Sequence, residues 1–473
     1  MLFPTFSFFV FFVFVFLLNW WLKRFSWKTH IWWRVFLFSV SYLFYATWDV
    51  RFLVSLFLVT VVNYFGAFYL TKAVNVVVAK RRLVLILSLD ILTLAFFKYF
   101  NFFRENVSLF LANIGLPPDF LLLHVVLPVG LSFYILRAIS YSFDVYRKKI
   151  PPEKSFLDLA VYISFFPYLL SGPILRADEF LGQLKQGGAK IIDNLWENLF
   201  LILSGLFKKI VVSSYLTMNI VDSVFAVPQN HSQLAVVLAV YAYALAIYCD
   251  FSGYTDLAIG IAGLMGFKSP ANFNQPYLAI DFQDFWRRWH ITLSNFLRDY
   301  VYIPLGGNRK GNLRTYVNLL ITMFVSGLWH GTGLQFIIWG LFHGLGLAFS
   351  RFKNQVTGKT FFRVEKVLSW FVTLNAICFL WIFFRAENME QAFAVIKQIF
   401  NWHSLPEPIN VFAGVLIFAG FIILAIGPIF KKAFLAVQEK LPLALQVLSV
   451  AVIVILIIRL GPDIVPPFIY FNF

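Results

Sequence analysis

Two histidines stand in a largely apolar stretch, GLWHGTGLQFIIWGLFHG, which covers residues 327–344 and contains five glycines. His330 follows an apolar run and precedes Gly-Thr-Gly, so a membrane helix is expected to break beside it. Irregular backbone at membrane depth is tolerated only where it is packed in protein or lines a cavity, and an ionisable side chain there is a candidate functional group. His330 is therefore a candidate general base, the alternative being a neutral imidazole bonded to a neighbouring carbonyl. His343 continues the following helix, where a packing role fits at least as well.

Three further side chains could join this chemistry. His290 ends the stretch FWRRWH, and it matters only if its ring faces the same cavity as His330. Asp250 and Asp256 lie in the apolar segment YCDFSGYTDLAIG. Buried carboxylates need partners or they become protonated, so we expect these two to orient a histidine, pair with an arginine or line an ion path.

Several common catalytic motifs are absent from the sequence. It has no GxSxG elbow, no Walker A loop, no HExxH helix and no CxxC pair, which argues against the matching hydrolases, ATPases and metal sites. Cys249 and Cys378 both lie in apolar segments and form no disulfide framework. Histidine, carboxylates and hydroxyls in an apolar setting suit general-base catalysis of a transfer reaction, with no bound metal or cofactor.

The elements that must position these residues are membrane helices. The chain has 473 residues, of which 60% are hydrophobic and 13% charged, whereas soluble domains carry roughly 25% charged residues. Continuous apolar runs reach the roughly 20 residues that span a bilayer, without the alternation of barrel strands. The sequence predicts a single all-α integral membrane domain over residues 1–473, with about 10 to 13 membrane helices including re-entrant or interfacial ones.

The net charge of +16 has a simple explanation in such a protein. Lys and Arg collect in cytoplasmic loops, so no nucleic acid partner is expected, and the early basic loops favour an outward N-terminus.

One segment, from Asp284 to Arg314, departs from the pattern of membrane spans. Apolar residues recur at helical spacing among its charges, which predicts an amphipathic helix: Phe285, Trp289, Leu293 and Phe296. Six cations outnumber two acids and leave a balance of +4: Arg287, Arg288, Arg298, Arg309, Lys310 and Arg314 against Asp284 and Asp299. Arg287, Arg288 and Arg309 are candidates to hold an anionic donor, and ordinary cytoplasmic positive charge is an equally good alternative.

Eight stretches together resemble the membrane-bound O-acyltransferase (MBOAT) family, in its bacterial branch of alginate O-acetyltransferase and teichoic-acid D-alanyl transfer membrane proteins. They run in family order from residue 44 to 388, with further helices at about 407–461: FYATWD, FFKYFNFF, LPVGLSFYILRAISYSFDVYR, FFPYLLSGPILRADEF, YCDFSGYTDLAIG, NFNQPYLAIDFQDFWRRWHITLSNFLRDYVYIPLGGNR, GLWHGTGLQFIIWGLFHG and WIFFRAEN. The chain departs from the family at Arg137, where a glutamine or small polar residue is usual.

The resemblance implies a fold, a site and a reaction. Its fold is a ring of tilted helices around a thin centre, with a funnel from each membrane face and two histidines where the funnels meet. Here these are His330, the residue on which acyl transfer depends, and His290, with Trp329 beside the first as a candidate substrate contact. The donor would be a cytoplasmic thioester, acetyl-coenzyme A or an acyl carrier, and the acceptor a hydroxyl of an exported polysaccharide. A separate periplasmic acetyltransferase partner and a bacterial inner-membrane location follow from the alginate-type system.

Other readings stay open at this point. A D-alanyl transferase would take its acyl group from a carrier protein, and acylation of a lipid or a protein fits the same fold. A proton-coupled transporter could use the histidines and Asp250 as a relay, although no internal repeat of the kind common in transporters is visible.

Overall fold

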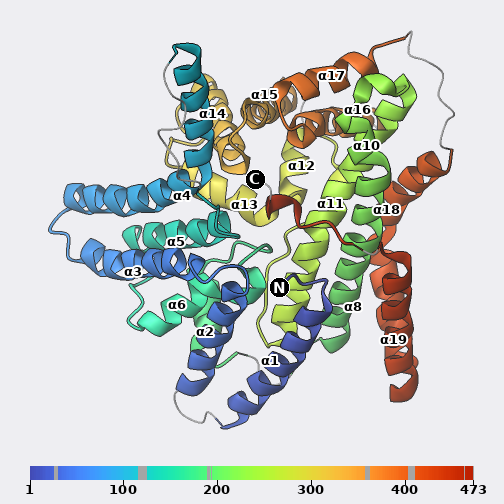
Figure 1. Cartoon of the computed structure of the whole chain (residues 1–473). Coiled ribbons are helices and arrows are strands. Elements are labelled where there is room, and N and C mark those ends of the chain that lie inside the picture. Colours follow the sequence, from blue (N-terminus) through green and yellow to red (C-terminus); the bar gives the residue numbers. More distant parts are fainter. Residues whose placement is uncertain are drawn as a thin grey trace. The chain divides into compact units, whose positions relative to one another are not determined.

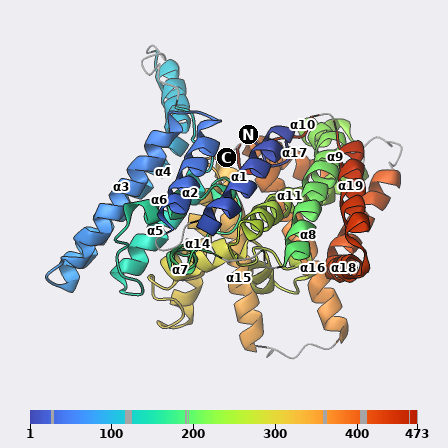
Figure 2. The ribbon, with the colours of Figure 1, turned by 90° about the horizontal axis from the view of Figure 1, so that it is seen from below.

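The computed structural model describes residues 1–25, 30–115, 125–188, 192, 194–356, 363–402, 411–462 and 464–471. These residues form helices and short helical turns, and within them there is no β-strand. The backbone divides into two compact units, residues 1–193 with 261–269, and residues 194–260 with 270–472. Figures 1 and 2 show the chain from two directions.

The helices of the first unit are α1 (Phe6–Phe25), α2 (Ile31–Ala46), α3 (Phe52–Thr71), α4 (Val76–Asn113), α5 (Leu131–Tyr146), α6 (Phe156–Ser164), η2 (Phe166–Tyr168) and α7 (Ala177–Lys185). Buried polar groups connect three of them. Asn63 of α3 donates to both carboxylate oxygens of Asp90 in α4, at 2.9 and 3.1 Å, and Ser142 of α5 donates to the Asn63 Oδ1 at 2.6 Å. Each polar atom so paired avoids the cost of an unpaired group in an apolar interior.

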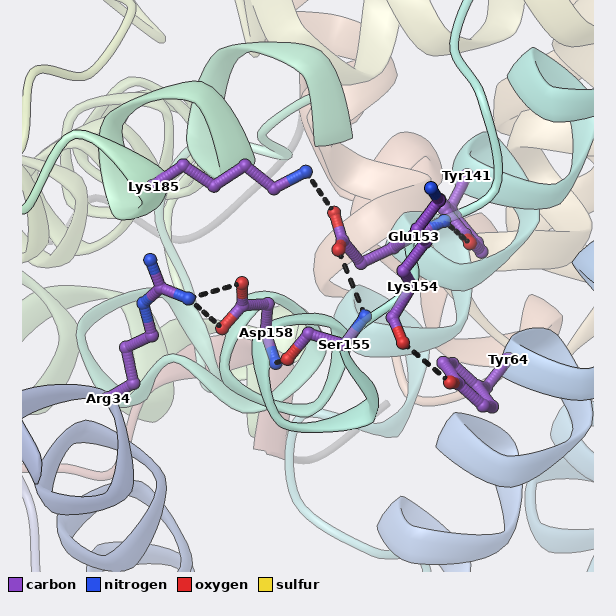
Figure 3. A network of polar contacts seen from close by, with 8 residues as sticks. All are labelled: Arg34, Tyr64, Tyr141, Glu153, Lys154, Ser155, Asp158 and Lys185. Atoms are coloured by element: carbon purple, nitrogen blue, oxygen red, sulfur yellow. Dashed lines mark hydrogen bonds and ion pairs between the residues drawn. The ribbon is translucent and has the colours of Figure 1, made fainter. Parts of the chain in front are cut away.

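A second polar network fixes the turn before α6 (Figure 3). Arg34 of α2 lies 3.0 Å from Asp158, and Lys185 of α7 lies 2.6 Å from Glu153. The Glu153 N–H donates to the Tyr141 hydroxyl of α5 at 2.9 Å. The turn is thereby tied to α5 and α7, and the first turn of α6 to α2, all in the same unit.

Arg137, where the chain departs from the family it resembles, has a structural role. The side chain is 1% exposed, and its guanidinium donates to the carbonyl oxygens of Tyr162 at 3.2 Å and Tyr168 at 3.1 Å. The arginine therefore joins α5 to the end of α6 and the η2 turn.

The second unit contains α8 (Leu195–Leu206), η3 (Phe207–Ser213), α9 (Ser214–Leu216), η4 (Thr217–Val221), α10 (Asp222–Ala226), η5 (Pro228–Asn230), most of α11 (Gln233–Leu264), η6 (Pro276–Leu278), α12 (Phe282–Arg288), α13 (Ile291–Leu297), η7 (Arg298–Tyr302), α14 (Asn312–His330), α15 (Leu334–Val356), α16 (Arg363–Arg385), α17 (Met389–Ile399), α18 (Val411–Lys440), α19 (Leu443–Leu460) and η8 (Ile469–Phe471). Both views show α18 and α19 near α8 (Figures 1 and 2). The η3, η4 and η7 stretches are π-helical, a wide geometry that is rare and frequently occurs at functional sites.

Eight helices among the described residues are long and apolar enough to cross a membrane: 6–24, 52–71, 76–113, 195–226, 233–264, 364–385, 413–440 and 443–460. Two shorter apolar helices among these residues cover 31–46 and 156–168. The helices that carry the GLWHGTGLQFIIWGLFHG stretch are α14 and α15. The chain is a multi-pass all-α membrane protein, as its composition predicts.

Candidate active site

His330 lies at the end of a helix, as its sequence neighbourhood predicts. Helix α14 ends at His330 and α15 begins at Leu334, which confirms a break at the intervening Gly-Thr-Gly. The Gly331 N–H still donates to the Gly327 carbonyl at 3.3 Å, so the last turn of α14 is closed. The His330 side chain is 2% exposed. The end of α14 therefore places an imidazole inside the second unit.

Two glycines allow α14 and α15 to approach closely. A Cβ on Gly327 would lie 2.4 Å from the carbonyl oxygen of Phe336, and a Cβ on Gly340 would lie 2.4 Å from the carbonyl oxygen of Met323. A backbone carbonyl cannot move aside as the tip of a flexible side chain can. Small residues at such positions are what permits close helix packing in membranes, and here the packing supports the loop that follows His330.

We expect Gly340→Ala to lower the stability of the folded protein. The added methyl overpacks the α14–α15 contact, and overpacking typically costs about 1–3 kcal/mol. Thermal unfolding of purified protein in detergent measures the effect. Gly414→Ala in α18 is the matched control, because a Cβ at Gly414 meets nothing within 4 Å. Equal unfolding temperatures for the two variants would contradict the close helix contact.

His290 stands in a break between α12 and α13, so the prediction of one continuous amphipathic helix is wrong. The helix ends before Trp289, and His290 has the left-handed backbone angles φ 42° and ψ 55°. Asn272, which belongs to neither helix, stabilises this break by accepting hydrogen bonds from the start of α13. Its carbonyl accepts from the Ile291 N–H at 2.9 Å, and its Oδ1 accepts from the N–H and hydroxyl of Thr292 at 3.2 and 2.8 Å.

The break places His290 in the protein core. The side chain is 0% exposed, and its ring meets the Phe251 ring nearly at right angles with centroids 4.6 Å apart. Burial lowers the pKa of His290 to about 3, so the imidazole is neutral at physiological pH. The predicted apolar face of the segment is buried as expected, at Phe285, Trp289, Leu293 and Phe296.

The two histidines have Trp329 as a common neighbour. The Trp329 ring centroid lies 4.8 Å from that of His330 and 6.2 Å from that of His290. Other aromatic rings complete the surroundings of His330: Trp339 at 4.9 Å, Phe384 at 5.1 Å and Tyr470 at 5.7 Å. The structure thus brings together three of the residues proposed from sequence, His330, His290 and Trp329, within an aromatic shell.

His343 is a packing residue, in agreement with the simpler of its two interpretations. It is 0% exposed, and its Nδ1 accepts a hydrogen bond from the Trp286 Nε1 at 3.2 Å. Its ring also lies against Trp339, with centroids 4.5 Å apart. These contacts connect α15 to α12.

Asp250 contacts a lysine and the C-terminal segment. Its Oδ1 lies 2.5 Å from the Lys209 Nζ, and its Oδ2 accepts from the Ile469 N–H at 2.8 Å. The sequence predicts a histidine contact, an arginine pair or an ion path for this carboxylate, and the structure pairs it with Lys209. Asp250 therefore contacts Ile469, whose neighbour Tyr470 lies beside His330.

Asp256 pairs with the adjacent lysine. The Lys208 Nζ lies 2.6 Å from the Asp256 Oδ2, and these side chains are 20% and 18% exposed. The π-helical turn that begins at Phe207 carries both lysines, so two consecutive residues reach two carboxylates of α11. Asp256 contacts this lysine and not the histidine site.

The basic segment from Asp284 to Arg314, which contains His290, is partly neutralised. Arg288 pairs with Asp284 at 2.8 Å and Arg298 with Asp299 at 2.7 Å. The four other cations of the segment are exposed: Arg287, Arg309, Lys310 and Arg314. Exposed charges of one sign suit a loosely held anionic ligand rather than a buried catalytic role.

The sequence does not single out two residues at or near the site: Tyr470, which packs beside His330, and Lys209, which pairs with Asp250. Lys209 is hidden in an apolar helical run, and nothing in that run shows that its helix widens to π geometry. Tyr470 follows the last membrane helix, outside the stretches that carry the family resemblance. A usable signal was present in PPFIYF at residues 466–471, because two prolines followed by four apolar or aromatic residues are unusual in a solvated tail.

Comparison with known proteins gives one family and several relatives. The profile of the membrane-bound O-acyltransferase family matches residues 145–391. A probable alginate O-acetylase of Pseudomonas aeruginosa is 38% identical over 370 residues, 78% of this chain and 70% of that protein. A peptidoglycan O-acetyltransferase of Helicobacter pylori is 37% identical over 390 residues, 77% of this chain and 73% of that protein. A teichoic acid D-alanyltransferase of Bacillus subtilis is more distant, 26% identical over 264 residues, 53% of this chain and 67% of that protein.

Proposed function

The chain belongs to the membrane-bound O-acyltransferase family, and from this premise we propose that it moves an acetyl group from a cytoplasmic thioester toward a hydroxyl of an exported polysaccharide, with His330 as general base. It is a multi-pass membrane O-acyltransferase. One observation carries the assignment of the base: His330 ends α14 in a buried aromatic shell that also contains His290.

The reaction can be written with the groups that this site provides. The acceptor oxygen attacks the thioester carbonyl carbon while the His330 imidazole takes the hydroxyl proton, so a C–O bond forms and the C–S bond breaks. The thiolate leaves and receives the proton back from the imidazolium. His290, neutral because it is buried, orients a reactant or donates a hydrogen bond to developing charge. The apolar rings around His330 limit the water that would hydrolyse the thioester.

The names of the relatives support a glycan acceptor. Alginate and peptidoglycan are both polysaccharides outside the cytoplasm, and the two relatives named for their acetylation each cover about three quarters of this chain. D-alanyl transfer is the second candidate, since the teichoic acid D-alanyltransferase matches this chain at lower identity. On this proposal the protein lies in a bacterial cytoplasmic membrane and works with a separate periplasmic acetyltransferase.

Replacing Arg309 and Lys310 together by glutamine should weaken use of the donor. Both residues are exposed cations close in sequence to His290, and coenzyme A carries phosphates. Exposed charge contacts contribute about 0.2–1 kcal/mol each, so we expect the loss of two to raise the donor KM roughly twofold to thirtyfold while the acceptor KM stays unchanged. Added salt should reproduce part of the defect in the unmodified protein.

The donor itself is tested with purified protein and labelled substrates. We expect transfer from acetyl-coenzyme A in the presence of the periplasmic partner and a glycan acceptor. Transfer only from an acyl-carrier protein would replace this proposal by the D-alanyl-type reaction. A His330-dependent ion flux without transfer from either donor would overturn the enzymatic proposal.

A further inference from the structure

A buried ion pair lies next to the histidine site. Its carboxylate belongs to Asp250, and the following residue, Phe251, contacts the His290 ring. The Lys209 Nζ and the Asp250 Oδ1 are 2.5 Å apart, and their side chains are 2% and 6% exposed. Taking two charges out of water is expensive, and such a pair frequently contributes less stability than well-packed apolar side chains would. General stability therefore does not explain why this pair is buried, and the contacts of the two side chains indicate a local role.

Both members of the pair also hold the C-terminal segment. The Lys209 Nζ donates to the carbonyl oxygen of Pro467 at 3.1 Å, and the Asp250 Oδ2 accepts from the Ile469 N–H at 2.8 Å. One hydrogen bond needs a donor at residue 209 and the other needs an acceptor at residue 250. Figure 1 shows this red segment leaving α19 within the second unit.

Tyr470 directly follows Ile469, and its ring packs among the side chains around His330. The Tyr470 ring centroid lies 5.7 Å from that of His330, 6.0 Å from that of Trp329 and 4.8 Å from that of Phe251. Phe251 is the residue after Asp250 and contacts His290. The ion pair and the two histidines are thus joined through a continuous set of packed rings.

We propose that Lys209 and Asp250 are positioning residues, which seat residues 467–470 so that Tyr470 forms one wall of the His330 site. They act on the reaction through the segment and touch no reactant. This inference rests on the proposed function, because it assigns the positioned site to acyl transfer. It differs from a purely structural role, in which the pair would only hold η3 against α11.

A charge-reversed variant separates the two roles. Lys209→Asp combined with Asp250→Lys restores the opposite charges and the attraction between η3 and α11. It does not restore the segment, because an aspartate at 209 cannot donate to the Pro467 carbonyl and a lysine at 250 cannot accept from the Ile469 N–H. We expect the double variant to recover the thermal stability lost by Lys209→Met or Asp250→Asn while its acyl transfer stays low.

Hydrogen–deuterium exchange of the full chain in detergent reports on the segment without using activity. In Lys209→Met, Asp250→Asn and the charge-reversed variant, amides of residues 464–471 should exchange faster than in the unmodified protein. Transfer should fall by about tenfold or more at unchanged donor KM, since misplacing a group by about 1 Å can cost about 100-fold. Lys209→Arg keeps both the charge and the donor, and should retain most of the transfer.

Lys208→Met is the matched control. Lys208 is the preceding residue of the same π-helical turn, and it pairs with Asp256 of the same partner helix. Its loss should leave the exchange of residues 464–471 unchanged and transfer within about twofold, below the effect of a misplaced group.

Two results would overturn the inference: unchanged exchange of residues 464–471 in the Lys209 and Asp250 variants, or full recovery of transfer by charge reversal. Failure of the proposed function can be told apart from failure of this inference. The exchange result does not depend on activity, whereas His330→Ala tests the transfer reaction itself.

Discussion

Replacement of His330 by alanine is expected to lower acyl transfer by about 1,000-fold, within the 10²–10⁴ that general acid–base catalysis typically contributes. The imidazole is the only group removed, and its shell of Trp329, Trp339 and Phe384 remains. Binding of the donor should change little, because a base acts on the proton in the transition state. Initial rates of labelled acetyl transfer, at matched amounts of purified protein, measure the effect.

His343→Gln is the control for this variant. Glutamine keeps an acceptor for the Trp286 Nε1–H, and His343 lies in the same helical hairpin as His330 with equal or greater burial. Transfer by His343→Gln should stay within about threefold of the unmodified rate, since the residue lies outside the transfer chemistry. Comparable transfer by His330→Ala and the unmodified protein, with both folded by size-exclusion chromatography, would remove His330 from the mechanism.

The second large effect is expected at His290, and its backbone decides which substitution tests it. His290 has φ 42°, a left-handed conformation that asparagine adopts far more readily than β-branched residues do. His290→Asn therefore removes the imidazole and preserves the break between α12 and α13. We expect transfer to fall by about 100-fold, comparable to the loss of one preorganised donor in other acyl-transfer sites.

Comparison with His290→Val shows whether the ring or the turn is responsible. Valine cannot adopt the left-handed turn without strain, so it should lower the unfolding temperature as well as the transfer rate. Full transfer by His290→Asn at normal stability would show that His290 serves only the turn, and the two-histidine site would then be wrong.

Local patterns in the sequence were sufficient for His330. An apolar run, a histidine and two glycines within four residues describe a helix end at membrane depth, and α14 ends at that histidine. The same local reasoning failed at His290. The segment has helical spacing throughout, and its break depends on hydrogen bonds that Asn272 accepts, eighteen residues before His290 in the chain.

The partners of the buried carboxylates show the same limit. Composition indicates that Asp250 needs a cation, but no local pattern tells whether this is a histidine, an arginine or a lysine. The choice follows from which residues of η3 face α11, and that depends on the width of the helical turn. Tyr470 is a stronger case, because its position near His330 is created by contacts of residues 467 and 469 that are more than 200 positions from their partners in sequence.

The π-helical turn at Phe207–Ser213 has a consequence for how relatives of this chain are aligned. A π turn contains one residue more than the α turn it replaces. The extra residue changes which of the following side chains face α11, whatever the types of those side chains are. Consecutive helical residues point about 100° apart, and shifting an alignment by one position exchanges Lys208 for Lys209. The two are chemically identical, yet one holds the buried carboxylate and the C-terminal segment while the other holds Asp256. An alignment gap misplaced by one residue beside these lysines would assign the contacts of Lys209 to Lys208. The sequence identity at the aligned position would not reveal the error, because both residues are lysine.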